Sequence, residues 1–139
     1  MPWYAFDILR LQVMKLKRLV IAVSEPVLAQ VLQTALGKDY AVSVCENGNE
    51  LPAVLEKLRP EALILNLFQR KTDGIRILEQ TRYQPPVILA FTYVLNDSLI
   101  IDAYRAGICE LLLLPCSRTY MLQRFQMHMT RFDQLKGGM

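Results

Sequence analysis

The sequence lacks any long apolar run. No apolar stretch in its 139 residues approaches the roughly 20 residues that a membrane-spanning helix needs. The segment 14–18, which contains Lys15, Lys17 and Arg18, precedes Leu19 to Val23, an apolar stretch of only five residues. A secretory signal needs about 7–15 such residues, so this pattern does not fit one. We therefore expect a cytoplasmic chain without a membrane partner.

Cysteine and histidine are also scarce. Cys45, Cys109 and Cys116 are odd in number and show no metal-ligand spacing, so we expect neither a metal nor a cofactor. Cys109 and Cys116 flank an expected strand that would hold them about 20 Å apart, too far for a disulfide. A redox role for Cys116 stays open. The single histidine, His128, is expected to pack, because it shares a helical stripe with Met121, Phe125, Phe132 and Leu135.

Charge of one sign is not concentrated anywhere. The chain has 16 basic and 13 acidic residues, a net charge of +3, and its basic residues are scattered. This distribution does not predict direct nucleic-acid binding. The hydrophobic content of 53% is high, which excludes a disordered chain and favours one domain whose sheet is covered on both faces.

Apolar strand-like runs alternate with segments of helical period from residue 18 onward. Strands are expected at 18–23, 41–45, 62–66, 87–92 and 110–114. Helices are expected at 27–36, 51–58, 73–82, 97–106 and 117–135. The first helix is expected to bury Val27, and residues 69–72 are expected to form a loop. Strict alternation predicts a flavodoxin-like α/β fold, a five-stranded parallel sheet in the order 2-1-3-4-5 with helices on both faces.

The predicted domain spans residues 18–135, between an extension at 1–17 that includes the start of the first strand and a tail at 136–139. Residues 1–13 are too apolar for a solvated tail. They fit an upstream start or an artificial extension, a helix that covers a partner surface, or a segment that packs on the domain. Gly137 and Gly138 suit the start of a linker to an output domain.

The ends of the expected strands carry the functional signal, because the carboxyl ends of parallel strands meet at one edge of a sheet. The layout resembles the receiver domain of bacterial response regulators. Thr92 lies 22 residues before Leu114, as the switch hydroxyl does relative to the receiver lysine. The other matching positions are Pro26, Asn47, Gly48, Pro60, Asp73, Gly74, Pro86, Ala106, Gly107 and Pro115.

The resemblance implies a phosphorylation pocket whose reactive residues have been replaced. Val23 and Ser24 stand where the family has an acidic pair, Asn66 where it has the phosphorylated Asp, and Leu114 where it has the Lys. An amide cannot attack phosphorus as a carboxylate does. Glu25 alone would be a poor Mg²⁺ site. We therefore expect a degenerate receiver, or pseudo-receiver, that is not an enzyme and binds no metal.

Two further positions complete this vestigial pocket. Phe68 stands where a backbone carbonyl of the family helps to hold the metal. Thr92 keeps the switch hydroxyl, but the aromatic partner of that switch falls at Leu111. A strand-end threonine bonded to backbone is the simpler interpretation of Thr92, and a backbone-capping amide is the simpler one of Asn66.

The helices expected at 97–106 and 117–135 carry more apolar residues than one sheet contact needs. This surplus fits either extra core packing or an interface made with the strand at 110–114, the face that receiver families use for association. Arginines could form the polar rim of such an interface. The candidate interface residues are Ile101, Tyr104, Arg118, Tyr120, Arg124, Met127 and Arg131.

The resulting expectation is a signalling or transcription-regulation module that works by association with a second copy or a protein partner. The alternative is a small-molecule sensor. Its crevice would be made apolar by Val23, Phe68 and Leu114, and its orienting polar groups would be Ser24, Asn66 and Thr92. A phosphoacceptor that uses some unusual residue is a third, weaker idea.

Overall fold

The computed structural model describes residues 16–69 and 72–137, and a five-stranded parallel sheet forms its centre. The strands are β1 (Lys17–Ala22), β2 (Tyr40–Val44), β3 (Ala62–Asn66), β6 (Val87–Thr92) and β7 (Glu110–Leu113). Their order is β2-β1-β3-β6-β7, and every neighbouring pair is parallel. The predicted flavodoxin-like topology is confirmed.

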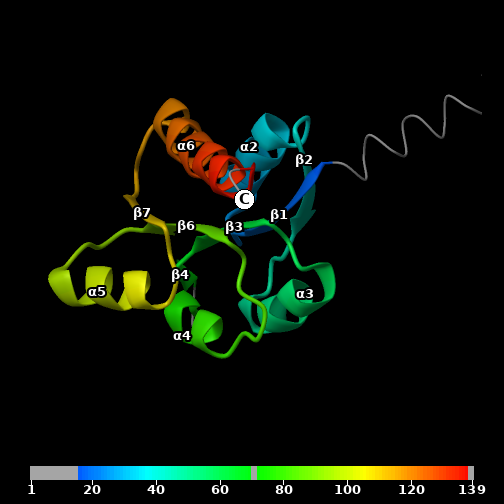
Figure 1. Cartoon of the computed structure of the whole chain (residues 1–139). Helices are drawn as coiled ribbons and strands as arrows, with labels where there is room; N and C mark the ends of the chain where they lie inside the picture. Colours follow the sequence, from blue (N-terminus) through cyan, green and yellow to red (C-terminus); the bar gives the residue numbers. More distant parts are fainter. Residues whose placement is uncertain (1–15, 70–71, 138–139) are drawn as a thin grey trace, which may run out of the picture.

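Helices cover both faces of this sheet, as Figure 1 shows. The helices are α2 (Pro26–Leu36), α3 (Leu51–Leu58), α4 (Gly74–Glu79), α5 (Asp97–Arg105) and α6 (Arg118–Gly137), with a short 3₁₀ turn η1 (Gly48–Glu50) before α3. Helices α2 and α6 lie on one face, and α3, α4 and α5 lie on the other. None of the helices in the described residues is long and apolar enough to cross a bilayer.

The alternation of side chains along each strand divides the core into two layers. Leu19 and Ile21 of β1 belong to the layer under α2 and α6, whereas Val20 and Ala22 belong to the layer under α3, α4 and α5. This alternation follows from the two-residue period of a strand. The continuous apolar runs of the central strands are therefore explained by burial on both faces.

Local capping fixes where several elements begin and end. The side chain of Asn96 accepts a hydrogen bond from the N–H of Leu99 at 2.9 Å, and Ser117 Oγ accepts one from the N–H of Tyr120 at 3.1 Å. These bonds satisfy helix N-terminal donors that would otherwise lack partners. Gly107 ends the α5 region with φ +99°, a conformation that glycine adopts without strain.

Several element bounds differ from those predicted. Helix α4 ends at Glu79, because the N–H of Gln80 is drawn to the carbonyls of both Arg76 and Ile77 and tightens the last turn. Helix α6 continues to Gly137, beyond the predicted end at 135. Of the loop expected at 69–72, Gln69 and Thr72 belong instead to β4 (Phe68–Gln69) and β5 (Thr72–Asp73), which pair antiparallel, and residues 70 and 71 lie outside the described residues.

Two residues assigned to buried helical stripes are solvent-exposed instead. Val27 is 78% exposed, because α2 buries the face that carries Ala29, Leu32 and Leu36. Leu135 is 70% exposed near the end of α6, so the stripe of that helix stops contributing to the core before its last turn. The expectations for residues 1–13 concern a segment that lies outside the described residues.

The assignment of the buried face of α2 predicts unequal effects of two substitutions. Leu32→Ala should lower the free energy of unfolding by about 2–5 kcal/mol, because it leaves a cavity at a side chain that is 1% exposed. Val27→Ala on the same helix should change that free energy by less than about 0.5 kcal/mol. Urea denaturation monitored by circular dichroism measures both values. Equal effects would contradict the assigned face.

Candidate functional site

The candidate site lies at the carboxyl edge of the sheet, where four chain segments end or turn. Val23 follows β1, Asn66 ends β3, Thr92 ends β6, and Leu114 follows β7. All four side chains are buried, with Asn66 2% exposed and Thr92 fully buried. The structure thus brings these four predicted residues to one edge and shields their side chains from solvent.

Asn66 is tied to the loop that follows β1 through a carboxylate. Its Nδ2 donates to Glu25 Oε1 at 3.4 Å, and the hydroxyl of Tyr93 donates to the same oxygen at 2.9 Å. The N–H of Phe68 donates to Asn66 Oδ1 at 3.4 Å. We call the Asn66–Glu25–Tyr93 contacts the Glu25 bridge. It joins the segments that follow β1, β3 and β6.

The hydrogen bond to Glu25 also raises the pKa of Tyr93, because the hydroxyl loses a favourable contact when it ionises beside a carboxylate. Tyr93 therefore remains a neutral donor at physiological pH. The Glu25 carboxylate is in turn occupied by two donors from within the protein.

The Thr92 side chain forms hydrogen bonds with the backbone of the segment that follows it. Its Oγ1 donates to the carbonyl of Val94 at 3.0 Å and lies 3.3 Å from the N–H of the same residue. The carbonyl of Thr92 accepts the N–H of Leu114 at 2.7 Å. These contacts agree with the simpler interpretation of Thr92, a strand-end residue that caps the following turn.

The donor set at this edge does not fit Mg²⁺. That ion prefers octahedral oxygen ligands, with carboxylates to balance its charge. Glu25 is the one carboxylate in the Glu25 bridge, and Asn66 contributes a neutral amide. Ser24 takes part in a contact of its own, and Phe68 lies exposed in β4. The described residues contain no group of three His, Cys, Asp or Glu side chains that could hold a metal ion.

A second polar cluster joins β7 to α6. Glu110 Oε1 accepts hydrogen bonds from Arg124 Nε at 2.8 Å and Arg124 Nη2 at 2.5 Å, and it lies 2.9 Å from His128 Nε2. Arg124 and His128 are one helical turn apart, so both reach the same carboxylate. Burial alone would raise the pKa of Glu110, but hydrogen bonds from His128 and Arg124 outweigh it and lower that pKa.

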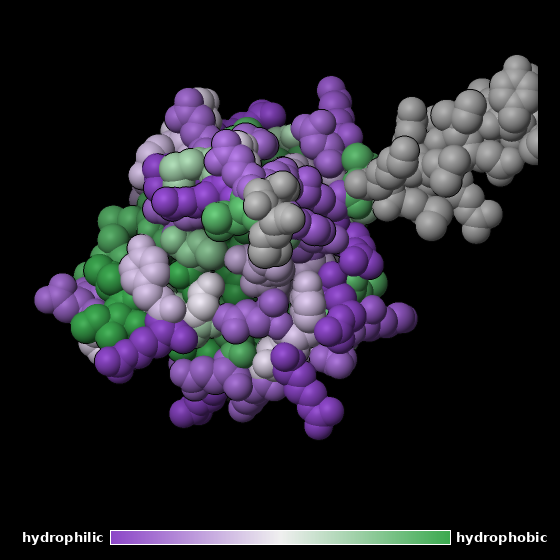
Figure 2. Space-filling view, in the orientation of Figure 1, coloured by the Kyte–Doolittle hydropathy of each residue, from purple (hydrophilic) through white to green (hydrophobic). Residues whose placement is uncertain are grey.

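The candidate interface residues lie around this cluster. Ile101, Tyr104, Tyr120 and Met127 are exposed, together with Leu113 of β7. Figure 2 shows hydrophobic side chains gathered on the side of the molecule where Figure 1 places α5 and β7. Arg118 and Arg131 are also exposed, whereas Arg124 is held by Glu110.

This site can be compared with solved structures, although no protein-family model matches the chain. A two-component response regulator from Clostridium difficile has 18% sequence identity and a TM-score of 0.74, over 84% of this chain and 98% of that chain. The BeF3-activated N-terminal receiver domain of RstA from Klebsiella pneumoniae has 23% identity and a TM-score of 0.67, over 80% and 97% respectively. The chain has the receiver fold.

Another similar structure is an adenylate cyclase from Rhodopirellula baltica, with 20% identity and a TM-score of 0.74, over 88% of this chain and 94% of that chain. At such identities the likeness establishes the fold, whereas chemistry depends on the residues at the site. In this receiver fold, the crevice is occupied by Val23, Asn66, Thr92 and Leu114.

Sequence reasoning missed two of these contacts. Tyr93 follows the apolar strand β6, and nothing in its position indicated that it reaches Glu25 across the edge. Glu110 did carry a signal, since it opens an otherwise apolar strand and its partners Arg124 and His128 are spaced by four residues on the next helix. A partly buried acidic residue is stabilised by such partners.

The Glu110 cluster predicts a pH-dependent stabilisation. Because the pKa of Glu110 is lowered by folding, its contribution is present above the ordinary carboxyl pKa of about 4.3. The contribution is lost as the pH falls through the lower pKa of the folded state. At about pH 7, Glu110→Gln should lower the free energy of unfolding by about 1 kcal/mol, since the cluster is partly exposed to solvent.

Urea denaturation at pH values between about 7 and 3.5 measures this difference, which should shrink towards zero at the acidic end. Glu56→Gln is the matched control, because the ion pair that Glu56 forms with Arg59 at 3.7 Å is exposed to solvent. A difference between wild type and Glu110→Gln that stays constant with pH would rule out the assigned role.

Proposed function

We propose that this chain is a pseudo-receiver, the regulatory domain of a two-component-type response or transcription regulator, and that it works by protein association without phosphorylation. The receiver fold supports the first part of the proposal. The second part rests on the Glu25 bridge. Asn66, at the position of the phosphorylated Asp, is a buried amide that donates to Glu25.

The Glu25 bridge supports the proposal for a chemical reason. Phosphoryl transfer needs an anionic nucleophile, a divalent cation and a cationic group that offsets charge on the moving phosphoryl group. Asn66 is neutral, Glu25 is engaged by Tyr93 and Asn66, and Leu114 has no charge. The loops after β1, β3 and β6 are thus linked by the protein's own donors.

Burial of the crevice favours association over small-molecule sensing. A ligand would need an open, concave site with convergent polar groups. Val23 and Leu114 instead pack in the core, and the polar atoms of Asn66 and Thr92 form hydrogen bonds within the protein. We therefore propose no enzyme activity and no cofactor for this domain, and no direct contact with nucleic acid or membrane. Its proposed location is the cytoplasm.

The surface formed by α5, β7 and α6 is the proposed place of association. We call it the α5–β7–α6 face, defined by Ile101, Tyr104, Leu113, Tyr120 and Met127. Exposed apolar side chains that gather on one surface are typical of interaction sites. Tyrosines and a flanking arginine such as Arg118 are residue types enriched at interfaces. The occupant is a second copy of the chain or a protein partner.

The absence of phosphoryl transfer can be tested directly. Incubation of the protein with acetyl phosphate and Mg²⁺ should leave its intact mass unchanged, because the crevice offers no carboxylate nucleophile at Asn66. Intact-mass spectrometry makes the measurement, with an active receiver domain treated in parallel as the positive control. A gain of one phosphoryl group would refute the proposed mechanism.

Association through the α5–β7–α6 face can be tested by size-exclusion chromatography with light scattering. The double variant Tyr104→Glu/Tyr120→Glu should have a lower average mass than the wild type at the same micromolar concentration, because two carboxylates would be desolvated in the interface. Val27→Glu, on the exposed side of α2, is the matched control. Equal masses for wild type and double variant would exclude self-association through this face.

The same measurement on a chain that begins at Met14 tests whether residues 1–13 contribute. If the occupant of this face is a protein partner in place of a second copy, neither chain should change in mass when Tyr104→Glu/Tyr120→Glu is introduced.

A further inference from the structure

The sheet has one edge that carries none of the usual protection against pairing. Among the described residues, β2 pairs with β1 alone, so its other side is open. Natural proteins block such edges with charged residues, prolines or bulges. The five residues of β2, Tyr-Ala-Val-Ser-Val, contain no charge, proline or glycine. This edge can therefore accept another strand.

The backbone groups that face the open side follow from one hydrogen bond. The N–H of Cys45 donates to the carbonyl of Ile21 in β1 at 2.9 Å. Successive residues of a strand turn their N–H and C=O groups to opposite sides. Residues 41 and 43 thus face β1 as Cys45 does, and the backbone groups of Tyr40, Val42 and Val44 face outward.

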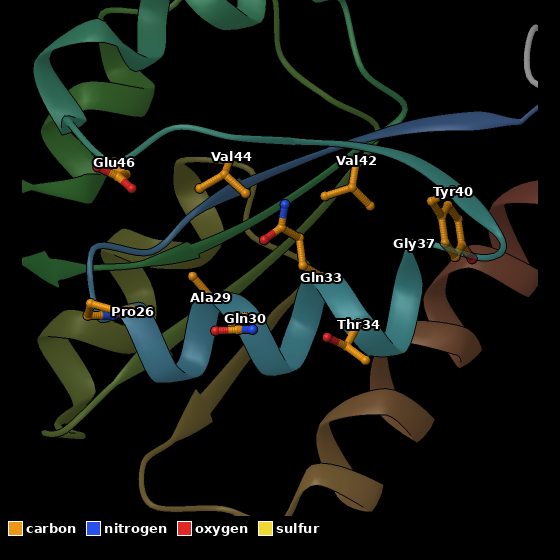
Figure 3. A pocket seen from close by; sticks show the side chains of 10 residues that line it. All are labelled: Pro26, Ala29, Gln30, Gln33, Thr34, Gly37, Tyr40, Val42, Val44 and Glu46. Carbon is orange, nitrogen blue, oxygen red and sulfur yellow. The ribbon is translucent and has the colours of Figure 1, made fainter.

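Space for an added strand exists on both faces of this edge. On the α2 side, a groove of about 670 Å³ lies between α2 and β2. In Figure 3, Val42 and Val44 point from β2 towards α2, and Gln33 points from α2 towards β2. On the α3 side, a smaller groove of about 270 Å³ extends over β1 and β2, and its lining includes Arg18, Ala41, Ser43 and Leu58. Side chains that alternate between the two faces can be accommodated.

Charge at the two ends of β2 selects the occupant and its direction. Lys38 lies in the turn between α2 and β2, two residues before Tyr40, and Glu46 lies in the loop after β2, two residues after Val44. Both are exposed, and neither forms an ion pair within the described part of the chain. In an antiparallel pairing of two β2 strands centred on Val42, Tyr40 lies opposite the partner's Val44. The turn that carries Lys38 then lies beside the loop that carries the partner's Glu46.

We propose that two copies of this chain associate through their β2 edges in that antiparallel register, so that the two sheets form one continuous sheet. Val42 pairs with the partner's Val42, and Tyr40 with the partner's Val44, each as a pair that exchanges two backbone hydrogen bonds. Two Lys38–Glu46 pairs flank them. A parallel arrangement would instead place like residues side by side. The interface is its own complement, as a two-fold dimer requires.

The groove lining supports this occupant. The α2 helices of the two copies would approach on the same face of the joined sheet. The side chains that α2 presents there are uncharged, namely Gln30, Gln33 and Thr34. They can meet their own copies without repulsion between like charges.

A charge-swap experiment tests the proposal separately from the α5–β7–α6 face. All variants are made in the full chain with Tyr104→Glu/Tyr120→Glu, which removes association through that face. Light scattering after size-exclusion chromatography should show a dimer in this background. Adding Glu46→Lys or Lys38→Glu should shift it to monomer, because each places like charges opposite one another. Adding both together should restore the dimer.

A second variant tests the backbone pairing. Val42→Pro removes an N–H that faces outward, so the bonds between β1 and β2 remain and only the dimer should be lost. Circular dichroism checks that each variant is folded.

A monomer in the Tyr104→Glu/Tyr120→Glu background would overturn the β2-edge proposal and leave the proposed function untouched. The β2-edge proposal would also be overturned if Glu46→Lys and Lys38→Glu each left the dimer intact, or if the two together did not restore it. If the full chain is a monomer and the chain that begins at Met14 is a dimer, residues 1–13 of the same chain occupy the β2 edge. That result would also overturn the β2-edge proposal. High salt should weaken the charge effects, since exposed pairs are screened.

Discussion

The parallel pairing of β3 with β1 on one side and β6 on the other is the constraint on which the rest of the structure depends. Every side chain of β3 is buried, because helices cover both faces of the sheet. A polar residue at the end of such a strand must find its partners inside the protein. Asn66 finds them in Glu25 and in the backbone of Phe68.

The hydrogen bonding of Asn66 within the protein affects how the domain could transmit a signal. An acidic residue at the position of Asn66 would be costly in this surrounding unless a cation balanced it. The neutral amide removes the need for a cation, and the Glu25 bridge links the loops that a metal and a phosphoryl group would otherwise connect. Under the proposed function, the state of these loops is then set by the sequence and by bound partners, not by a chemical modification.

The sequence predicted the fold well where burial alone determines structure. The bounds of β3 and β6 were predicted to the residue, because both strands are continuous apolar runs between turn residues. Prediction was wrong for Val27, whose apolar character did not imply contact with the core, and for the end of α4. An isolated helical stripe does not reveal which side meets the sheet, and the last turn depends on competing carbonyls near Gln80.

The candidate site was predictable in location but not in its contacts. Strand ends can be aligned from the sequence, and this alignment brings Asn66, Thr92 and Leu114 to one edge. The hydrogen bond from Tyr93 to Glu25 joins residues 68 positions apart, so it depends on the tertiary arrangement of two loops. The same holds for the grooves beside β2, which arise from how far α2 and α3 extend over the edge strand.

The two proposed interfaces lie at opposite ends of the sheet, since β2 and β7 are its two outer strands. Occupation of one therefore does not block the other. Two different two-fold interfaces on one protomer generate extended arrays unless their axes intersect in a closed group. A chain that used both would form assemblies larger than a dimer. A protein partner would instead bind the α5–β7–α6 face of each copy in a β2-linked dimer and prevent further growth. The size of the assembly therefore indicates which occupant that face holds.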